Sequence, residues 1–243
     1  MHAVGATPLQ ARVADRLATV QESIADACAG VGRDPAGIRI VAITKGHPVE
    51  AVLAAIHVGL TDIGENRVQE ALGKLGPDVR ATGGSRVRWH MVGHLQRNKV
   101  RDALTLFDWV QSVDSLRLAR ALSRRAGDGG RALKILIEIN AGGEEQKYGF
   151  GPERAVEAGL AVARLPGVEV RGVMAMAPWT DDEDRLRRAF RVAREVFESL
   201  RDRADGTIDT LSMGMTNDYR IAVQEGATML RLGTALFGPR RES

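Results

Sequence analysis

Short apolar strand patterns alternate with amphipathic helical patterns along almost all of this 243-residue chain. Apolar runs rich in β-branched residues predict eight strands. They cover Ile38–Thr44, Asp62–Glu65, Arg88–Val92, Trp109–Val113, Lys134–Asn140, Val168–Met176, Thr210–Met213 and Met229–Phe237. Because helices separate these strands, we expect a parallel sheet, and at this length the simplest arrangement is a single (β/α)8 TIM barrel. A doubly wound open sheet is the alternative.

Helical patterns fill the segments between the predicted strands. These helices begin near Pro48, Arg67 and Asp114 or Ser115, and cover Gln96–Leu104, Pro152–Arg164, Asp182–Arg203 and Asn217–Gln224. A further helix is predicted over Pro8–Ala29, where apolar residues recur at spacings of three and four. Only Gly238–Ser243 follow the eighth strand, so we expect this extra N-terminal helix to cover the place of a missing last helix, within one domain over residues 1–243.

Charge and composition exclude several classes of protein. The 34 Lys and Arg residues exceed the 31 Asp and Glu residues by only three, and aromatic residues make up 4% of the chain, so a nucleic-acid surface is not expected. The single cysteine, Cys28, cannot form an intramolecular disulfide, which favours a reducing compartment. Neither a signal-peptide pattern nor an apolar run of ~18 residues appears, so we expect a cytoplasmic protein without a membrane partner.

Functional side chains of a TIM barrel project from the C-terminal ends of its strands, which draws attention to Lys45 after the first strand. Burial there disfavours the charged form of an amine and lowers its pKa, so that Lys45 could act as a nucleophile and form a Schiff base with an aldehyde. The alternative is a lysine that emerges into solvent, as most lysines do.

A phosphate site is predicted where the seventh and eighth strands end. Ser212–Asp218 runs from a strand into a short helix and offers hydroxyl and backbone N–H groups, and Gly233 and Thr234 add further donors. A well-capped helix beside a tightly packed glycine would explain the same residues.

Arg231 stands in the apolar run of the eighth strand, where a buried guanidinium needs an acceptor. A pyridine nitrogen is one possible acceptor, and a structural ion pair with Glu138 is the other. His90 and His94 have the i, i+4 spacing of a helical metal pair, but the glutamate of a zinc-protease motif is missing and the segment reads as a strand and a turn, so no metal site is expected.

Six motifs, in this order along the chain, resemble those of one family. They are Val41–Lys45, Asp62–Glu70, Trp89–Lys99, Gln146–Phe150, Leu211–Asp218 and Arg231–Gly238. The family is that of the pyridoxal 5'-phosphate (PLP) homeostasis proteins, which are similar to the barrel domain of alanine racemase. The resemblance spans nearly the whole chain and implies a fold-type III PLP-binding barrel.

The resemblance also implies a role for each matching residue. Lys45 would hold PLP as a Schiff base, Arg231 would face the pyridine nitrogen, and Asn66 and Met176 would line the ring. The phosphate would be bound by Ser212, Gly233 and Thr234 with help from nearby backbone amides, and Met213 is included among the cofactor-binding residues.

Three functions follow as hypotheses. An arginine keeps its proton, so a pyridine ring opposite Arg231 is a weak electron sink, and neither Tyr148 nor Tyr219 lies in a segment that resembles the second base of the racemases. We therefore expect a carrier that acts in PLP homeostasis and passes PLP to apoenzymes, without a catalytic residue. The alternative is a weak PLP-dependent racemase in which Lys45 is the base.

The third hypothesis is an interaction protein that docks on acidic partners through Arg97, Lys99 and Arg101, although these residues also suit a solvated helix face. We expect a monomer or a weak homodimer. Lys147 is a candidate for a second lysine that binds PLP.

Overall fold

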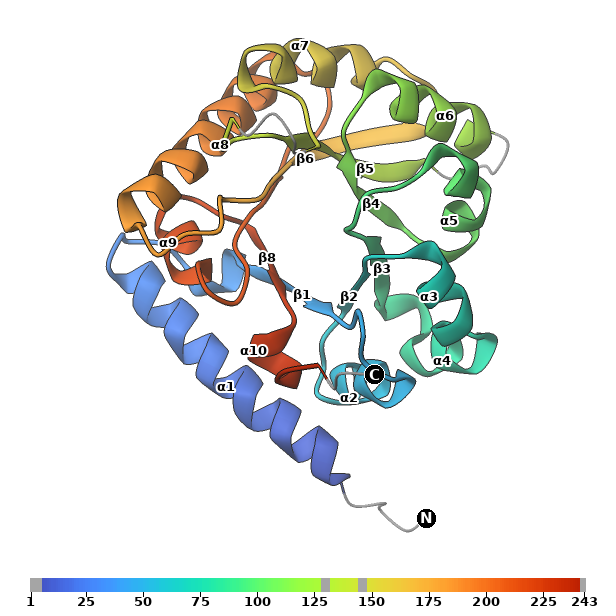
Figure 1. Ribbon diagram of the computed structural model, residues 1–243, viewed down its shortest axis with the longest axis vertical. Helices are drawn as coiled ribbons and strands as arrows, with labels where there is room; N and C mark the ends of the chain where they lie inside the picture. The colour runs from blue at the N-terminus through green and yellow to red at the C-terminus, as the bar shows by residue number, and fades with distance from the viewer. Residues whose placement is uncertain (1–5, 128–131, 144–147, 241–243) are drawn as a thin grey trace.

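The computed structural model describes residues 6–127, 132–143 and 148–240. Eight parallel strands close into a barrel in the order β1 to β8, with helices around it (Figure 1), which confirms the predicted TIM barrel. The strands are β1 Arg39–Ile43, β2 Asp62–Glu65, β3 Arg88–Met91, β4 Trp109–Val113, β5 Leu133–Ile139, β6 Val168–Ala175, β7 Thr210–Ser212 and β8 Met229–Leu232. Closure between β1 and β8 rules out the open sheet, because Arg39–Ala42 pair with Met229–Leu232.

The helices lie outside the barrel and bury their apolar faces against it. They are α1 Pro8–Ala29, α2 Val49–His57, α3 Val68–Lys74, α4 Pro77–Gly83, α5 Val100–Leu106, α6 Leu116–Ala126, α7 Pro152–Ala163, α8 Glu183–Arg203, α9 Tyr219–Gln224 and α10 Thr234–Phe237, with short 3-10 turns η1 Pro35–Gly37, η2 Gly84–Arg86 and η3 Arg97–Lys99. The helix predicted from Arg67 is two helices, because Pro77 begins a new one.

The last predicted strand was too long. β8 ends at Leu232, and Thr234–Phe237 form the short helix α10 instead of a continued strand. The reason lies at Gly233, whose backbone (φ −112°, ψ −81°) turns the chain out of the sheet. The prediction that no helix follows the eighth strand was therefore wrong.

The N-terminal helix α1 packs beside α9 and α10 and also touches α2 (Figure 1). Thr7 caps α1 through a capping box with Gln10, and one apolar stripe of the helix is buried. The stripe consists of Val13, Leu17, Val20, Ile24, Ala27 and Cys28. α1 thus closes the helical ring where α10 is too short to do so, as the sequence predicts.

The inside of the barrel follows from strand register. Residues in register on neighbouring strands point to the same face of the sheet, as do Val41 with Arg231 and His90 with Trp109. The inner side chains include two small apolar clusters and three buried polar residues: Val41, Ile43, Val92 and Met229; Trp109, Leu136 and Met174; and His90, Gln111 and Ser212. The barrel therefore encloses buried polar side chains between apolar ones.

A bulge interrupts β6. Ile135 pairs with Val170 but Leu136 pairs with Gly172, so Arg171 is an extra residue in β6. Gly172 has a φ of +147°, and a Cβ there would lie 1.8 Å from the carbonyl oxygen of Thr210 on β7. Only glycine fits this close approach between β6 and β7.

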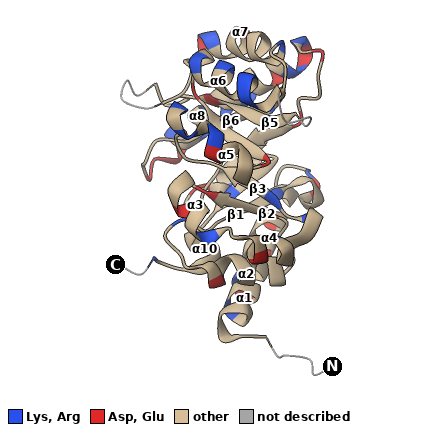
Figure 2. Ribbon diagram, turned by 90° about the vertical axis from the view of Figure 1, so that its right-hand side faces the viewer, with Lys and Arg blue, Asp and Glu red and all other residues tan. Residues whose placement is uncertain are grey.

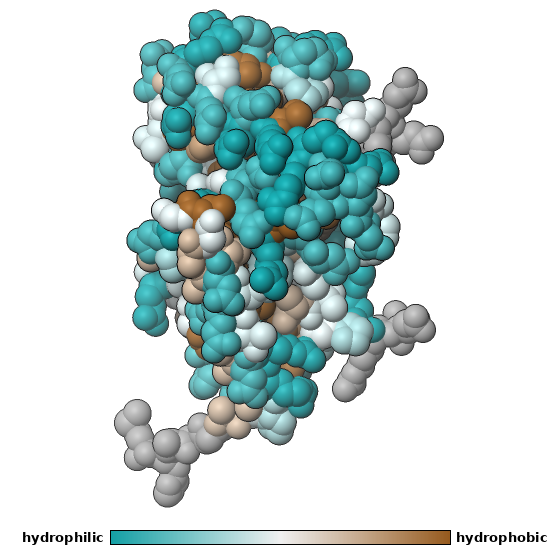
Figure 3. Space-filling view, turned by 90° about the vertical axis from the view of Figure 1, so that its left-hand side faces the viewer, coloured by the Kyte–Doolittle hydropathy of each residue, from teal (hydrophilic) through white to brown (hydrophobic). Residues whose placement is uncertain are grey.

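The outer surface is predominantly polar. The face over α1 and α8 is mostly hydrophilic, with scattered apolar residues (Figure 3). In the described ranges no helix combines the length and the apolar character that a membrane crossing requires. Charged residues of both signs are spread over the view in Figure 2.

Candidate functional site

A cavity of about 740 Å³ opens at the C-terminal ends of the strands. Its lining includes Lys45, Asn66, Met176, Arg231, Gly233 and Thr234, which are six of the eight residues predicted to bind a cofactor. Ser212 and Met213 are buried and do not line it. The position of the cavity is the usual place for a TIM-barrel active site.

Lys45 stands two residues after the end of β1 and its side chain is half-buried in this cavity. Burial lowers the pKa of the Lys45 amine, and the positive charges of Arg240 and Arg231 lower it further, while Glu70 opposes the shift. The fraction of neutral, nucleophilic amine at a given pH is therefore higher than for an exposed lysine.

The backbone around Lys45 is held by a buried ion cluster. Lys74 on α3 donates to the Thr44 carbonyl oxygen at 2.7 Å, and to the carboxylates of Glu65 at 2.7 Å and Glu70 at 2.8 Å. Glu70 in turn accepts a hydrogen bond from the Gly46 N–H at 2.6 Å. The residues before and after Lys45 are thus both fixed to the same lysine–glutamate cluster.

Arg231 lies on β8, which pairs with β1, and its side chain lines the same cavity as Lys45. It is 5% exposed, and burial lowers its pKa to about 10, although Asp218 and Glu138 favour its charged form. Its guanidinium donates to Ser212 Oγ at 2.7 Å and to the Ala175 carbonyl oxygen at 2.9 Å. Neither hydrogen bond goes to Glu138, so the ion pair considered from the sequence is not among the contacts that hold this arginine.

A chain of buried hydrogen bonds runs from Arg231 through the barrel. The Ser212 hydroxyl donates to Gln111 Oε1 at 2.7 Å, Gln111 Nε2 lies 3.0 Å from His90 Nδ1, and His90 Nε2 lies 2.9 Å from Asp62 Oδ1. Arg88 completes it with hydrogen bonds to Asp62. We call this set, Arg231–Ser212–Gln111–His90–Asp62, the barrel relay.

The charge states of Asp62 and His90 determine which group donates and which accepts in each hydrogen bond of the barrel relay. Burial disfavours the charge of Asp62, but hydrogen bonds from His90 and Arg88 outweigh it and hold the pKa of Asp62 well below its usual range. Burial lowers the pKa of His90, so the ring is neutral and donates its Nε2 proton to Asp62. Nδ1 must then accept from Gln111, which leaves the Gln111 oxygen for Ser212. Both ring nitrogens of His90 are therefore engaged in hydrogen bonds within the barrel.

Glu138 on β5 also lines the cavity. It is 3% exposed, and its Oε2 has no hydrogen-bond partner among the described residues. Burial, together with the negative charge of Asp114, raises the pKa of Glu138 to about 7, and Arg231 opposes that shift. The cavity therefore contains a carboxyl group that exchanges a proton near neutral pH.

Small residues and hydroxyls form the wall next to α10. Thr216, Gly233 and Thr234 line the cavity there, and Thr216 Oγ1 accepts the Ala235 N–H at 3.1 Å. A Cβ at Gly233 would lie 3.3 Å from the Ile43 carbonyl oxygen, so a larger residue would tighten this wall. This wall presents the hydroxyl groups of Thr216 and Thr234 beside the backbone of Gly233, which has no side chain. Such a surface suits an oxyanion.

The rim of the cavity is aromatic and apolar. Tyr148 stacks on His94 with ring centroids 3.8 Å apart, and His94 Nδ1 lies 2.9 Å from Asp114 Oδ2. Met176 is 38% exposed and Trp179 is 87% exposed at the same rim. Among the described residues, no group of three or more His, Cys, Asp or Glu side chains could hold a metal ion.

Sequence reasoning missed several residues of the site. Thr216 lies within the Leu211–Asp218 motif but was not assigned to the site. Its position shortly after the seventh strand, where functional residues of a TIM barrel gather, could have identified it. Gln111 carried no signal, because its partners His90 and Ser212 are distant in sequence. Lys74 has the i, i+4 spacing to Glu70 that could have indicated an ion pair, but its hydrogen bond to Thr44 joins residues 30 positions apart. Lys147, the candidate for a second PLP lysine, lies outside the described residues.

This chain is similar to known proteins in sequence and in fold. The family model of the alanine racemase N-terminal domain matches residues 31–241. The pyridoxal phosphate homeostasis protein of Pseudomonas aeruginosa is 39% identical over 228 residues, which cover 94% of this chain and 96% of that protein. PipY of Synechococcus elongatus with PLP bound superposes with a TM-score of 0.78 at 35% identity, covering 93% of this chain and 100% of that one.

The crystal structure of an unknown protein from Bifidobacterium adolescentis superposes with a TM-score of 0.90 at 34% identity, over 97% of this chain and 98% of that one. The closed barrel is thus that of the alanine racemase N-terminal domain class, whose family model covers most of the chain. Within this class, the chain belongs to the pyridoxal phosphate homeostasis protein family.

Proposed function

We propose that this protein binds PLP, acts in intracellular PLP homeostasis and passes PLP to apoenzymes, with residues 1–243 as one PLP-binding domain. The observation that carries the proposal is a half-buried amine, Lys45, in one cavity with Arg231 and a wall of hydroxyls. Relatives named as PLP homeostasis proteins, and PipY with PLP bound, support it. PLP supplies the aldehyde with which the Lys45 amine forms a Schiff base.

The residues of the cavity fit the three parts of PLP, which are the aldehyde, the phosphate and the pyridine ring. The lowered pKa of Lys45 suits an amine that must be neutral to react, and the buried cluster around Lys74 holds its backbone in place. Thr216, Gly233 and Thr234 would bind the phosphate. Because Ser212 and Met213 do not line the cavity, we propose that Ser212 acts indirectly, by orienting Arg231.

Arg231 would face the pyridine nitrogen, and the barrel relay keeps its guanidinium in one orientation. An arginine does not readily give up its proton, so it supports binding of the ring without making it a strong electron sink. Asn66 and Met176 would contact the ring plane. This arrangement favours a carrier over a catalyst.

The test is the Lys45→Ala variant. We expect PLP-saturated wild-type protein to show an absorbance band near the edge of the visible range that disappears in the variant. Intact mass after borohydride reduction, followed by peptide mapping, should locate the adduct on Lys45. Adducts on other lysines of the wild type with none on Lys45 would contradict the assignment.

A weak PLP-dependent enzyme is the second candidate, and Glu138 is the observation that favours it. A carboxyl with a pKa of about 7 in the same cavity is a possible acid or base. Deuterium exchange at the α-carbon of alanine and other amino acids distinguishes the two functions. Exchange no faster than with free PLP supports the carrier, and exchange that is lost in Glu138→Gln supports the enzyme.

A further inference from the structure

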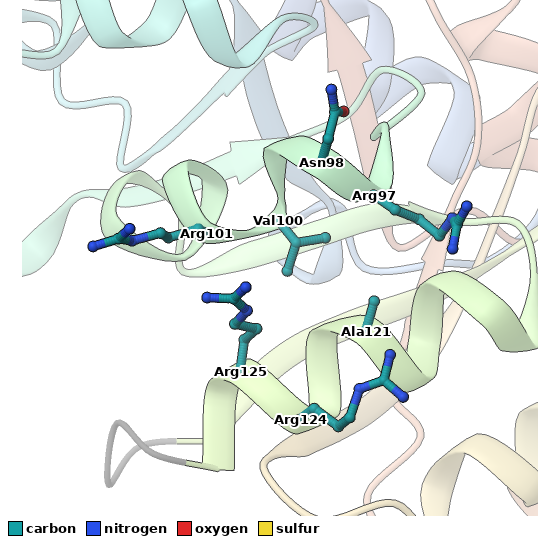
Figure 4. Close-up of a pocket in the computed structure, with 7 residues that line it drawn as sticks. All are labelled: Arg97, Asn98, Val100, Arg101, Ala121, Arg124 and Arg125. Carbon is teal, nitrogen blue, oxygen red and sulfur yellow. The ribbon is translucent and has the colours of Figure 1, made fainter.

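A second cavity, of about 440 Å³, lies on the outside of the barrel between η3, α5 and α6. Figure 4 shows four arginines around it: Arg97 and Arg101 on one side, Arg124 and Arg125 of α6 on the other. Val100 and Ala121 contribute the apolar part of its lining. We call these four arginines and the space between them the arginine pocket. It shares no lining residue with the cavity that contains Lys45.

The arginine pocket differs from other basic regions of the surface because it contains no carboxylate. All four arginines are exposed, and none forms an ion pair with another described residue. On α8, by contrast, Arg187 pairs with Glu183 and Glu225, and Arg203 pairs with Glu157. α6 has four arginines and no acidic residue over Leu116–Ala126, and its basic segments are visible in Figure 2.

The four arginines place four like charges along one pocket, and in Figure 4 the side chains of Arg97 and Arg101 extend in opposite directions, so the charges are spread along the pocket. Like charges with no carboxylate among the lining residues repel one another. A bound anion removes the repulsion. Guanidinium groups bind phosphate and carboxylate oxygens through paired N–H groups, and such charge-assisted hydrogen bonds are among the strongest in proteins. The geometry therefore suits an anion that touches both sides of the pocket.

We propose that the arginine pocket binds a small anion that carries two or more phosphate groups. An anion of three or four negative charges balances the four guanidinium groups, and the spread of the arginine side chains along the pocket suits an anion with more than one phosphate group. The pocket is concave and falls within the ~300–1,000 Å³ range of small-molecule sites, whereas a protein partner would meet a flatter surface. A polyphosphate anion thus fits better than an acidic protein segment.

The experiment is isothermal titration of sodium tripolyphosphate into the full-length protein preincubated with PLP, at physiological ionic strength. We expect one tripolyphosphate site that is tighter than the site for inorganic phosphate. The double variant Arg124→Gln/Arg125→Gln should weaken binding by about tenfold or more, because it removes one side of the pocket. A titration without PLP should show the same dependence on these arginines, which separates this result from the function of Lys45.

The matched control is Arg117→Gln/Arg120→Gln, which removes the same charge from exposed positions of the same helix that do not line the pocket. It should change the affinity by less than about twofold, because neither side chain lines the pocket and salt weakens the effect of exposed charges. Equal weakening by both double variants would show a general charge effect and overturn the proposal. So would binding of a polyglutamate peptide, but not of tripolyphosphate, through Arg124 and Arg125, because the pocket would then be a docking site for acidic proteins.

Discussion

Glu138 is a carboxyl group that its surroundings do not satisfy. Its Oε2 has no described partner, and burial raises the pKa of Glu138 to about 7. A carboxyl with a raised pKa binds its proton more tightly in the folded protein than in the unfolded chain. The resulting stabilisation is complete below pH 4.5, the unfolded value, and disappears as the pH rises through 7.

We predict that Glu138→Gln changes how stability depends on pH. In the absence of PLP, the stability of the variant relative to the wild type should rise by about 3 kcal/mol between pH 4.5 and pH 8, because only the wild type must bury a carboxylate at high pH. Urea denaturation at a series of pH values measures this. The exposed Glu195→Gln on α8 is the control, and a difference between wild type and Glu138→Gln that does not vary with pH would contradict the assignment.

The barrel relay gives a second prediction, at Gln111. Gln111→Leu removes the acceptor of Ser212 and the donor to His90, so we expect a loss of about 1–3 kcal/mol in the free energy of unfolding. PLP affinity should also fall, because Arg231 loses the orientation of its Ser212 partner. If the residues act as one chain, combining Gln111→Leu with Ser212→Ala should cost less than the sum of the two single changes. Additive effects would show that they act separately.

The sequence predicts those site residues whose place follows from the local pattern of elements, and misses the contacts between residues distant in the chain. Lys45 and Asn66 stand within two residues of the ends of β1 and β2, so their place at the mouth of the barrel can be read from the pattern of elements. Ser212 is the last residue of β7 but is buried inside the barrel, where its hydroxyl meets Gln111, a residue 101 positions earlier in the chain. Such pairings depend on the closed register of the barrel, which no local pattern contains.

At the scale of elements, the interiors of strands and helices were predictable and several of their ends were not. Periodicity predicts Trp109–Val113 and Pro8–Ala29 with the bounds that the structure shows. The end of β8 was missed, because the apolar run Ala235–Phe237 continues past the turn at Gly233 and serves a helix instead. The bulge at Arg171 was also not foreseen, since an extra residue leaves the apolar pattern of β6 nearly unchanged.

The bulge in β6 carries a prediction for Gly172. Gly172→Ala would place a Cβ 1.8 Å from the Thr210 carbonyl oxygen, so β6 and β7 must separate. We expect a loss of about 3–5 kcal/mol in the free energy of unfolding, or failure to fold. The control is Gly206→Ala, where an added Cβ meets no atom within 4 Å. Thermal unfolding of the two variants compares them, and equal melting temperatures would contradict the close approach.

At the scale of the whole molecule, α1 supplies the surface that completes the helical ring. We predict that Val20→Asp destabilises the protein by about 3 kcal/mol or more, because Val20 is 4% exposed and a carboxylate there would be buried without a partner. Ala18→Asp, on the exposed face of the same helix, should change stability by less than about 0.5 kcal/mol. Similar melting temperatures for the two variants would show that α1 is dispensable to the barrel.

The salt-bridged cluster on either side of Lys45 also bears on the proposed uptake and release of PLP. Hydrogen bonds tie the Thr44 carbonyl and the Gly46 amide to α3, so the main chain there is held in place while the four-carbon side chain of Lys45 can rotate. Under the proposed function, loading and unloading would then require making and breaking one bond at the Lys45 amine, without a movement of the backbone. In hydrogen–deuterium exchange, the Gly46 amide should consequently exchange slowly with or without PLP.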